Sequence, residues 1–383
     1  MEKKLVLIDG HSILNRAFYG IPDLTNSEGI HTNAVYGFLN ILLKILGEEQ
    51  PEYLTVAFDV KHPTFRHEMY KEYKGTRSGM PKELVEQVPI IKEILQAMEI
   101  EIVEMPGFEA DDILGSYAYR AQADGMVVSL ISGDRDTLQI ATDKIRIRIP
   151  KTKKTGTITQ DYYAKDVEEA YGVTPKEFID VKALMGDPSD NIPGVPGIGE
   201  KTATALIQKY GSIEEAYAHV EEVTPNRAKE SLKEHFDLAQ LSKDLATIRL
   251  NLDIEYNWKQ AEIHNIFTPA AYELCKRYEF KNILSQFELE EDKSENSELI
   301  TLDKVSFNQI IDQLKQTDIF AFSGSLGEKK KGRSQQLIVE FATKDKEYQY
   351  VVEYNEETVN EIQQVVDQLI ELPMQKVSPN LKS

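Results

Sequence analysis

The sequence has 383 residues, of which 41% are hydrophobic and 28% charged, a composition typical of a folded globular protein rather than a disordered chain. Its single cysteine, Cys275, excludes an intramolecular disulfide and every cysteine-based zinc site, so we expect a reducing compartment and metal ligands of oxygen or histidine. The net charge of −20 argues against polyanionic partners unless the acids bind cations or the basic residues cluster. The sequence shows no signal peptide and no membrane span, so we expect a cytoplasmic protein without membrane contact.

Residues 4–150 alternate between short apolar runs and helical patterns, which predicts an α/β domain with a mostly parallel sheet. The predicted strands are residues 5–8, 53–58, 100–103 and 126–131. Acids directly follow three of these strands, namely Asp9, Asp59, and Asp134 with Asp136. Ligands of such sheets bind beyond the carboxyl ends of the strands, so we expect these carboxylates to meet at one edge.

The stretch MPGFEADDILGSYA, residues 105–118, gathers three carboxylates at the start of a predicted helix: Glu109, Asp111 and Asp112. Burying such charges unpaired costs several kcal/mol per ion by rough estimate, so positive charge is expected nearby. A basic partner, the helix N-terminus or a metal ion could supply it. The strand-end acids add negative charge to the same edge, which favours divalent cations over a local basic partner.

The acids that follow strands or cluster in short motifs form one candidate metal-binding set. Its members are Asp9, Asp59, Glu109, Asp111, Asp112, Asp134, Asp136, Asp187 and Asp190. Oxygen ligands without histidine suit Mg²⁺ or Mn²⁺, and two such ions are a standard arrangement for phosphodiester hydrolysis. For any one acid, a role as helix cap or surface charge stays open.

Residues 61–82 form a basic segment within the acidic chain, with six Lys or Arg against two Glu. The basic residues alternate with Phe65, Tyr70 and Tyr73, a pattern suited to phosphate contact and base stacking on single-stranded nucleic acid. We therefore predict DNA contacts for Arg66 and Lys71. A solvated amphipathic loop is the alternative.

From about residue 160 the sequence is helical, and Thr174 and Ser212 each begin a capping box. Between them, closely spaced glycines precede a helix, which lets backbone N–H groups approach a phosphate. The predicted DNA contacts there are Gly197, Gly199, Lys201 and Thr202. The spacing is not that of a nucleotide-binding P-loop. A helical hairpin without function is the alternative.

Residues 286–299 are rich in acids and poor in apolar side chains, which predicts a linker. Residues 300–383 resume an α/β pattern that stops at Ser383.

Five segments together closely resemble the 5′-nuclease domain of bacterial DNA polymerase I, within the flap-endonuclease family. They are LVLIDGHSILNRAFY, VAFDVKHPTFRHEMYKEYKGTR, PGFEADDILG, ISGDRDTLQI and MGDPSDNIPGVPGIGEKTA, in family order over about residues 1–285. The resemblance implies a PIN-like catalytic domain with a helical arch over residues 1–172. It also implies, over residues 173–285, a helical subdomain with a helix-hairpin-helix-type (H3TH) motif that grips duplex DNA, commonly around a potassium ion.

The resemblance also assigns roles residue by residue. It implies that the nine acids hold metal ions, that Lys74 and Arg77 contact the scissile phosphate, and that Arg16 and Tyr73 lie near the reacting nucleotide. Beyond residue 300 the chain resembles the start of a 3′–5′ exonuclease-like domain, but Ser323 and Ser325 stand where a proofreading version carries Asp and Glu. We therefore expect an incomplete, catalytically empty domain, no polymerase, and a chain that is a fragment or a truncated gene product.

These observations predict a monomeric, two-metal nuclease that cleaves DNA at the junction of a 5′ flap or nick with duplex, as in RNA-primer removal and repair. A non-catalytic DNA-binding clamp is one alternative, but it leaves the strand-end acids unexplained. A PIN-type ribonuclease is another, and it leaves the basic segment and the glycine hairpin without a role.

Overall fold

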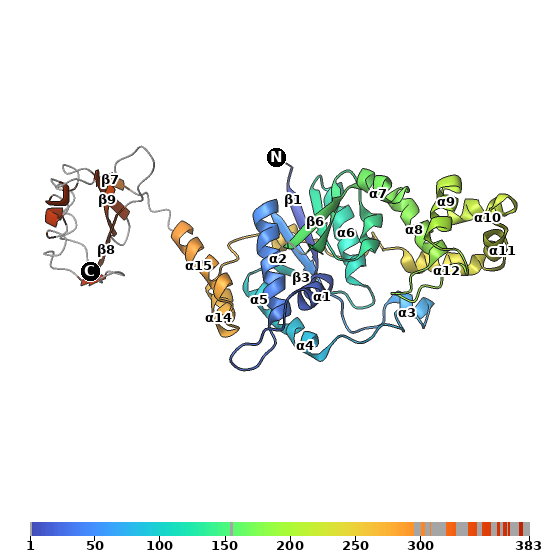
Figure 1. Cartoon of the computed structure of the whole chain (residues 1–383), viewed down its shortest axis with the longest axis horizontal. Helices are drawn as coiled ribbons and strands as arrows, with labels where there is room; N and C mark the ends of the chain where they lie inside the picture. Colours follow the sequence, from blue (N-terminus) through green and yellow to red (C-terminus); the bar gives the residue numbers. More distant parts are fainter. Residues whose placement is uncertain are drawn as a thin grey trace. The chain divides into compact units, whose positions relative to one another are not determined.

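The computed structural model describes residues 2–153 and 156–294, followed by separate short segments between residues 300 and 377. The chain divides into two compact units, Met1–Glu288 and Leu289–Ser383 (Figure 1). The larger unit contains every predicted site residue.

A six-stranded sheet in the order β3-β2-β1-β4-β5-β6 forms the centre of the larger unit. Its strands are β1 Lys4–Asp9, β2 Tyr53–Ala57, β3 Glu101–Val103, β4 Val127–Ile131, β5 Ile145–Lys153 and β6 Gly156–Tyr162. All neighbouring strands are parallel except β5 and β6. The four predicted strands are confirmed, and β1 lies between β2 and β4, so three acid-bearing strand ends are adjacent.

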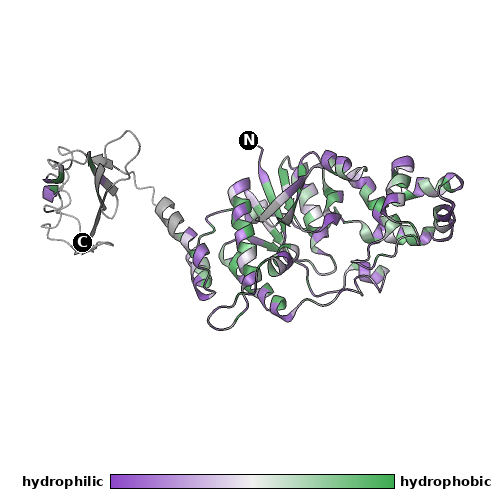
Figure 2. Ribbon diagram, in the orientation of Figure 1, coloured by the Kyte–Doolittle hydropathy of each residue, from purple (hydrophilic) through white to green (hydrophobic). Residues whose placement is uncertain are grey.

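Two hydrophobic cores lie on the two faces of this sheet, because alternate side chains of β1 point in opposite directions. Leu5 and Leu7 pack in the core that includes α6, Ala110–Ala123. Val6 and Ile8 pack in the core that includes α1 Gly10–Gly20, α2 Asn33–Glu49 and α5 Gln87–Ala97. Burial on both faces explains why β1 is a continuous apolar run, and Figure 2 shows green, hydrophobic ribbon among the strands at the centre of the larger unit.

The basic segment, residues 61–82, lies between β2 and α5; it contains the short helix α3 Phe65–Met69 and ends at the first residue of α4 Lys82–Val85. Turns follow α3, and Lys74 adopts a left-handed backbone conformation with φ of 55°. The Lys74 backbone N–H donates to the carbonyl oxygen of Asp190 at 2.8 Å, which joins the basic segment to the loop after α8.

The helical subdomain begins after the sheet. Its helices are α7 Ala164–Tyr171, α8 Pro175–Met185, α9 Glu200–Tyr210, α10 Ile213–Ala218, α11 Asn226–Glu234 and α12 Phe236–Ala246. Thr174 caps α8 and Ser212 caps α10, as predicted, and Gly211 ends α9 in the left-handed conformation. The loop between α8 and α9 requires glycine at position 197, where φ is 79°.

Three further helices are α13 Trp258–Ala261, α14 Pro269–Arg277 and α15 Lys281–Ser294, and two 3₁₀ turns are η1 Arg135–Ile140 and η2 Val220–Glu222. None of the helices in the described part of the chain is long and apolar enough to cross a membrane. The division between the two units falls at residue 288, within the predicted linker 286–299, and the first part of that segment is helical, because α15 continues to Ser294. Glutamate, leucine and lysine are good helix formers, and Phe287 is buried on this helix.

The smaller unit contains a mixed sheet in the order β11-β8-β9-β10-β7. Its strands are β7 Ile300–Leu302, β8 Ile319–Leu326, β9 Gln336–Ala342, β10 Glu347–Glu353 and β11 Gln375–Val377. Ser323 and Ser325 belong to β8.

Candidate active site

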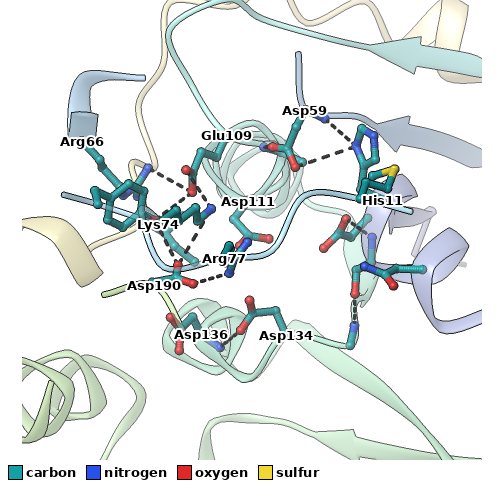
Figure 3. A pocket seen from close by; sticks show the side chains of 18 of the residues that line it. His11, Asp59, Arg66, Lys74, Arg77, Glu109, Asp111, Asp134, Asp136 and Asp190 are labelled. Atoms are coloured by element: carbon teal, nitrogen blue, oxygen red, sulfur yellow. Dashed lines mark hydrogen bonds and ion pairs between the residues drawn. The ribbon is translucent and has the colours of Figure 1, made fainter. Parts of the chain in front are cut away.

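A cavity of about 990 Å³ lies at the carboxyl ends of the strands. Seven of the nine predicted acids line it: Asp9, Asp59, Glu109, Asp111, Asp134, Asp136 and Asp190. The four predicted catalytic residues, Arg16, Tyr73, Lys74 and Arg77, also line it. Figure 3 shows Asp111 between the pair formed by Asp59 and His11 and the group formed by Lys74, Arg77 and Asp190.

Backbone and hydroxyl donors fix the strand-end carboxylates. Asp9 accepts from the Ser12 N–H at 2.9 Å and from the Ser132 hydroxyl at 2.8 Å. Asp59 accepts from the Ala110 N–H, at the start of α6, at 2.7 Å. Three strand ends thus bring acids into one cavity, as the alternating pattern predicted.

The negative charge of Asp111 is not balanced by a lysine or arginine among the described residues. Within the described residues its buried Oδ1 atom has no hydrogen-bond partner. Burial and the nearby negative charges of Asp9, Asp134 and Asp59 raise the pKa of Asp111 well above its usual value. Burial also raises the pKa of Asp9 to about 7. The cavity is therefore electrostatically unfavourable unless a cation enters it.

Asp112, by contrast, does not line the cavity, and the structure lends no support to its prediction as a metal ligand. It is fully buried, and its Oδ2 and Oδ1 atoms accept from Arg66 Nη1 at 2.7 Å and Nη2 at 2.9 Å. Arg66 borders the cavity but is only 2% exposed and bound to Asp112, so the structure lends no support to its prediction as a DNA contact. The helical period carries Asp112 away from Asp111, and Arg66 neutralises it inside the protein.

Lys74 and Arg77 of the basic segment neutralise two further acids. Lys74 Nζ lies 2.8 Å from Glu109 Oε1, and Arg77 forms an ion pair with Asp190. The Tyr73 hydroxyl lies 3.2 Å from Glu109 Oε2 and 3.1 Å from Asp190 Oδ2, although the tyrosine ring is buried. The sequence argument against a local basic partner is therefore wrong for Glu109 and Asp112, and it holds for Asp111.

A lysine that the sequence reasoning missed connects two more predicted acids. Lys182 Nζ, on α8, lies 2.7 Å from Asp136 Oδ1 and 2.5 Å from Asp187 Oδ2. Both carboxylates raise the pKa of Lys182, outweighing the opposing effect of its burial, so the lysine stays charged. Asp187 points to this lysine and does not line the cavity.

Ion pairing with lysine and arginine side chains divides the nine acids into two groups. Glu109, Asp112, Asp136, Asp187 and Asp190 each form an ion pair with lysine or arginine. Across the described residues, no such pair involves Asp9, Asp59, Asp111 or Asp134. Likewise, no three acid, histidine or cysteine side chains in the described part already form a ready metal cage. The donors still fit a hard divalent ion, because they are carboxylate oxygens and Asp111 Oδ1 is buried without a partner.

The predicted DNA contacts of the glycine hairpin lie outside this cavity, on the loop before α9 and on its first turn. Lys201 is exposed and Thr202 half-buried. Arg227, which the sequence reasoning missed, lies over the hairpin: its Nε atom would be 3.0 Å from a Cβ built on Gly197. Lys71 is exposed on the basic segment.

Two family models match the chain consecutively. The 5′–3′ exonuclease N-terminal resolvase-like domain matches residues 4–172, and the 5′–3′ exonuclease C-terminal SAM fold matches residues 173–268. The chain belongs to the 5′–3′ exonuclease family.

Among relatives of this 5′–3′ exonuclease chain are two DNA polymerases I. That of Bacillus caldotenax is 46% identical over 288 residues, covering 75% of this chain and 33% of the relative. That of Bacillus subtilis (strain 168) is 44% identical over 311 residues, covering 81% and 35%. The chain thus spans about a third of the length of these relatives.

Solved structures share the fold. A bacteriophage T5 5′-exonuclease with bound zinc ions has a TM-score of 0.54 and 24% identity, covering 64% of this chain and 90% of that one. A bacteriophage T5 flap endonuclease with DNA and metal ions has a TM-score of 0.53 and 22% identity, covering 74% and 96%. The PIN-like fold inferred from the motifs is confirmed.

Proposed function

We propose that this chain is a divalent-metal-dependent nuclease that hydrolyses a phosphodiester bond where a 5′ single-stranded flap or a nick meets duplex DNA. The observation that carries the proposal is the uncompensated Asp111 carboxylate, buried among strand-end acids in a cavity bordered by the basic segment. Membership of the 5′–3′ exonuclease family supports the proposal. The T5 flap endonuclease, which shares the fold, was solved with DNA and metal ions.

Asp9, Asp59, Asp111 and Asp134 would hold the first ion, because no lysine or arginine in the described structure neutralises them. Asp136, Asp187 and Asp190 would contribute to a second ion if Lys182 and Arg77 release them. We infer Mg²⁺, with Mn²⁺ as a substitute, from the all-oxygen donors. Such ions, when bound, lower the pKa of the attacking water and stabilise charge on the phosphate. A potassium ion at the glycine hairpin is a further proposal.

The cations of the basic segment would receive the substrate phosphate. Lys74 and Arg77 are held at the cavity by Glu109 and Asp190, so they are already oriented where negative charge would develop. Arg16 lines the same cavity and could bind the adjoining phosphate. Holding these groups before the substrate arrives reduces the reorganisation needed in the reaction.

The helical hairpin would bind the duplex part of the substrate. Exposed Lys201 and the glycine backbone at the start of α9 suit contact with a phosphate, and Arg227 adds charge beside them. Such contacts position a duplex without reading its sequence. We therefore propose a structure-specific enzyme that acts as a monomer and accepts RNA primers paired to DNA.

The test is cleavage of a labelled 5′-flap duplex by the full chain with Mg²⁺, beside Asp111→Ala and Asp134→Ala. We expect cleavage at the junction by the unchanged chain, none with chelator, and a loss of several orders of magnitude in both variants. Tight binding of the duplex without metal-dependent cleavage would favour the clamp instead. Preferred cleavage of single-stranded RNA would favour a PIN-type ribonuclease.

Residues 300–383 are proposed to be catalytically empty. Their resemblance to a 3′–5′ exonuclease-like domain lacks the two acids, because Ser323 and Ser325 stand at those positions of the sequence. Degradation of a recessed 3′ end that survives Asp111→Ala would contradict this proposal.

A further inference from the structure

The buried ion pair between Arg66 and Asp112 joins three parts of the molecule. Arg66 belongs to α3 in the basic segment, and Asp112 to the first turn of α6. Asp112 Oδ2 also accepts from the Glu109 backbone N–H at 3.1 Å, so it fixes the start of the helix that carries Glu109 and Asp111. The third part is residues 245–252, which lead from α12 back towards α6 and are called the return segment here.

The same ion pair holds the backbone of the return segment. Arg66 Nε donates to the carbonyl oxygen of Leu245 at 2.8 Å, and its Nη2 donates to that of Thr247 at 2.9 Å. The Arg249 N–H donates to Asp112 Oδ1 at 2.9 Å. Every guanidinium nitrogen and both carboxylate oxygens are therefore used to hold main chain or each other.

Two further buried side chains bind the return segment. Gln139, in the turn after Asp134 and Asp136, donates to the Ala246 carbonyl oxygen and accepts from the Ile248 N–H, both at 2.9 Å. Ser116, on α6, donates to the Arg249 carbonyl oxygen at 3.1 Å. The return segment is thus attached to the two elements that carry Asp111 and Asp134.

The return segment also borders the catalytic cavity and continues into the hairpin helices. Leu245, Ala246 and Ile248 line the cavity. In α12, which leads into the segment, the Ser242 hydroxyl accepts from the Gly194 N–H of the hairpin loop at 2.9 Å. Hydrogen bonds, together with the main chain of α12 between Ser242 and Leu245, therefore connect the hairpin loop through Arg66 and Asp112 to the first turn of α6.

We propose that Arg66 and Asp112 are positioning residues: their ion pair keeps Glu109 and Asp111 in register with the helical subdomain that would hold the duplex. The inference rests on the proposed nuclease function, and it gives both residues a role different from metal ligation or DNA contact. Residues that orient metal ligands typically change metal affinity or activity by about 10- to 100-fold when replaced. A purely structural pair would change stability alone.

The test compares Arg66→Lys, Asp112→Asn and the double variant Arg66→Gln with Asp112→Asn. The double variant replaces the ion pair with two neutral amides that can still hydrogen-bond. Glu49→Gln is the matched control, because Glu49 is a buried carboxylate paired with Arg148 at 2.5 Å and with Lys4 at the opposite end of β1. The melting temperature of each full-length protein is measured first. At a temperature well below it, kcat and KM on the 5′-flap duplex and the affinity for Mn²⁺ without DNA are then measured.

We expect each single variant to lose about 10- to 100-fold in kcat and to bind Mn²⁺ more weakly, while KM changes little. The double variant should recover much of both losses, and Glu49→Gln should lower only the melting temperature. A chain that does not cleave but shows this Mn²⁺ pattern would refute the nuclease function and leave the positioning role standing.

Three results would overturn the inference. Failure of the double variant to recover, with kcat as low as in Asp112→Asn, would return Asp112 to the metal ligands. A raised KM at unchanged kcat in Arg66→Lys would make Arg66 a DNA contact. A change in melting temperature alone would make the pair structural.

Discussion

Replacing Asp9 by asparagine tests the charge balance of the cavity through stability rather than activity. The Asp9 carboxyl is buried at the end of β1, and burial together with Asp59 and Asp134 raises its pKa from 3.8 to about 7. The folded protein therefore keeps a proton on Asp9 that the unfolded chain has lost above pH 4. Because the folded state binds more protons, the free energy of unfolding of the metal-free protein falls as pH rises towards 7.

The size of this effect follows from the shift. Between about pH 5 and pH 7 the Asp9 carboxyl contributes about two pH units of differential proton binding, or about 3 kcal/mol at 1.36 kcal/mol per unit. Asparagine cannot ionise, so Asp9→Asn should gain about 3 kcal/mol relative to the unchanged chain over this range. The hydrogen bonds from Ser12 and Ser132 favour the ionised carboxylate and lower its pKa, so their pH-dependent effect is already contained in the value of about 7.

The assay is urea unfolding of both proteins in chelator, at about pH 5 and about pH 8. The free energy of unfolding of the variant, relative to that of the unchanged chain, should grow with pH. Saturating Mg²⁺ should stabilise the unchanged chain much more than the variant, because binding to the folded state adds to stability. The variant should also lose flap cleavage. An advantage that is equal at both pH values would refute the reasoning, because it would show that Asp9 does not carry the unfavourable charge.

Three other predictions test separate parts of the molecule. Titration with Mn²⁺ in the absence of DNA should show about one tightly bound ion, and Lys182→Met should increase that number because Asp136 and Asp187 lose their lysine. Lys201→Ala should weaken duplex binding and reduce its salt dependence by about one unit of slope, while kcat at saturating DNA stays unchanged. Gly197→Ala should lower the free energy of unfolding by about 1–3 kcal/mol and weaken duplex binding, because φ is 79° and Arg227 Nε lies 3.0 Å from the position of the new Cβ.

The sequence predicted the sheet and the meeting of its acids because both depend on local patterns and one general rule. Apolar runs of strand length predicted β1, β2, β3 and β4, and the carboxyl ends of parallel strands lie at one edge of the sheet. Asp9, Asp59 and Asp134 could therefore be placed in one cavity without knowing any side-chain contact. The caps of α8 and α10 were predictable for the same reason, since a capping box is a local interaction.

Side-chain partners far apart in the sequence could not be predicted in this way. Arg66 and Asp112 are separated by 46 positions, and each carries a charge that also suited the cavity. Only the folded chain, which places Arg66 of α3 beside the first turn of α6, decides that they face each other. Lys182 has the same character, because nothing in the pattern around α8 indicates that it reaches Asp136. The acidic composition after residue 286 did not indicate that α15 continues to Ser294, because charged residues continue a helix as readily as they form a linker.

The internal cations also change what the acidic clusters mean. Nine acids in a cavity region suggest two equivalent ions, but five of them already have a lysine or arginine in the described structure. The negative charge that remains is concentrated on Asp9, Asp59, Asp111 and Asp134, which come from three strand ends and one helix start. A first ion would meet four carboxylates without displacing any side chain, whereas a second would have to replace Lys182 or Arg77. Binding of a substrate phosphate would draw Arg77 from Asp190, so the substrate itself would free one ligand of the second ion, while Lys182 would still pair with Asp136 and Asp187.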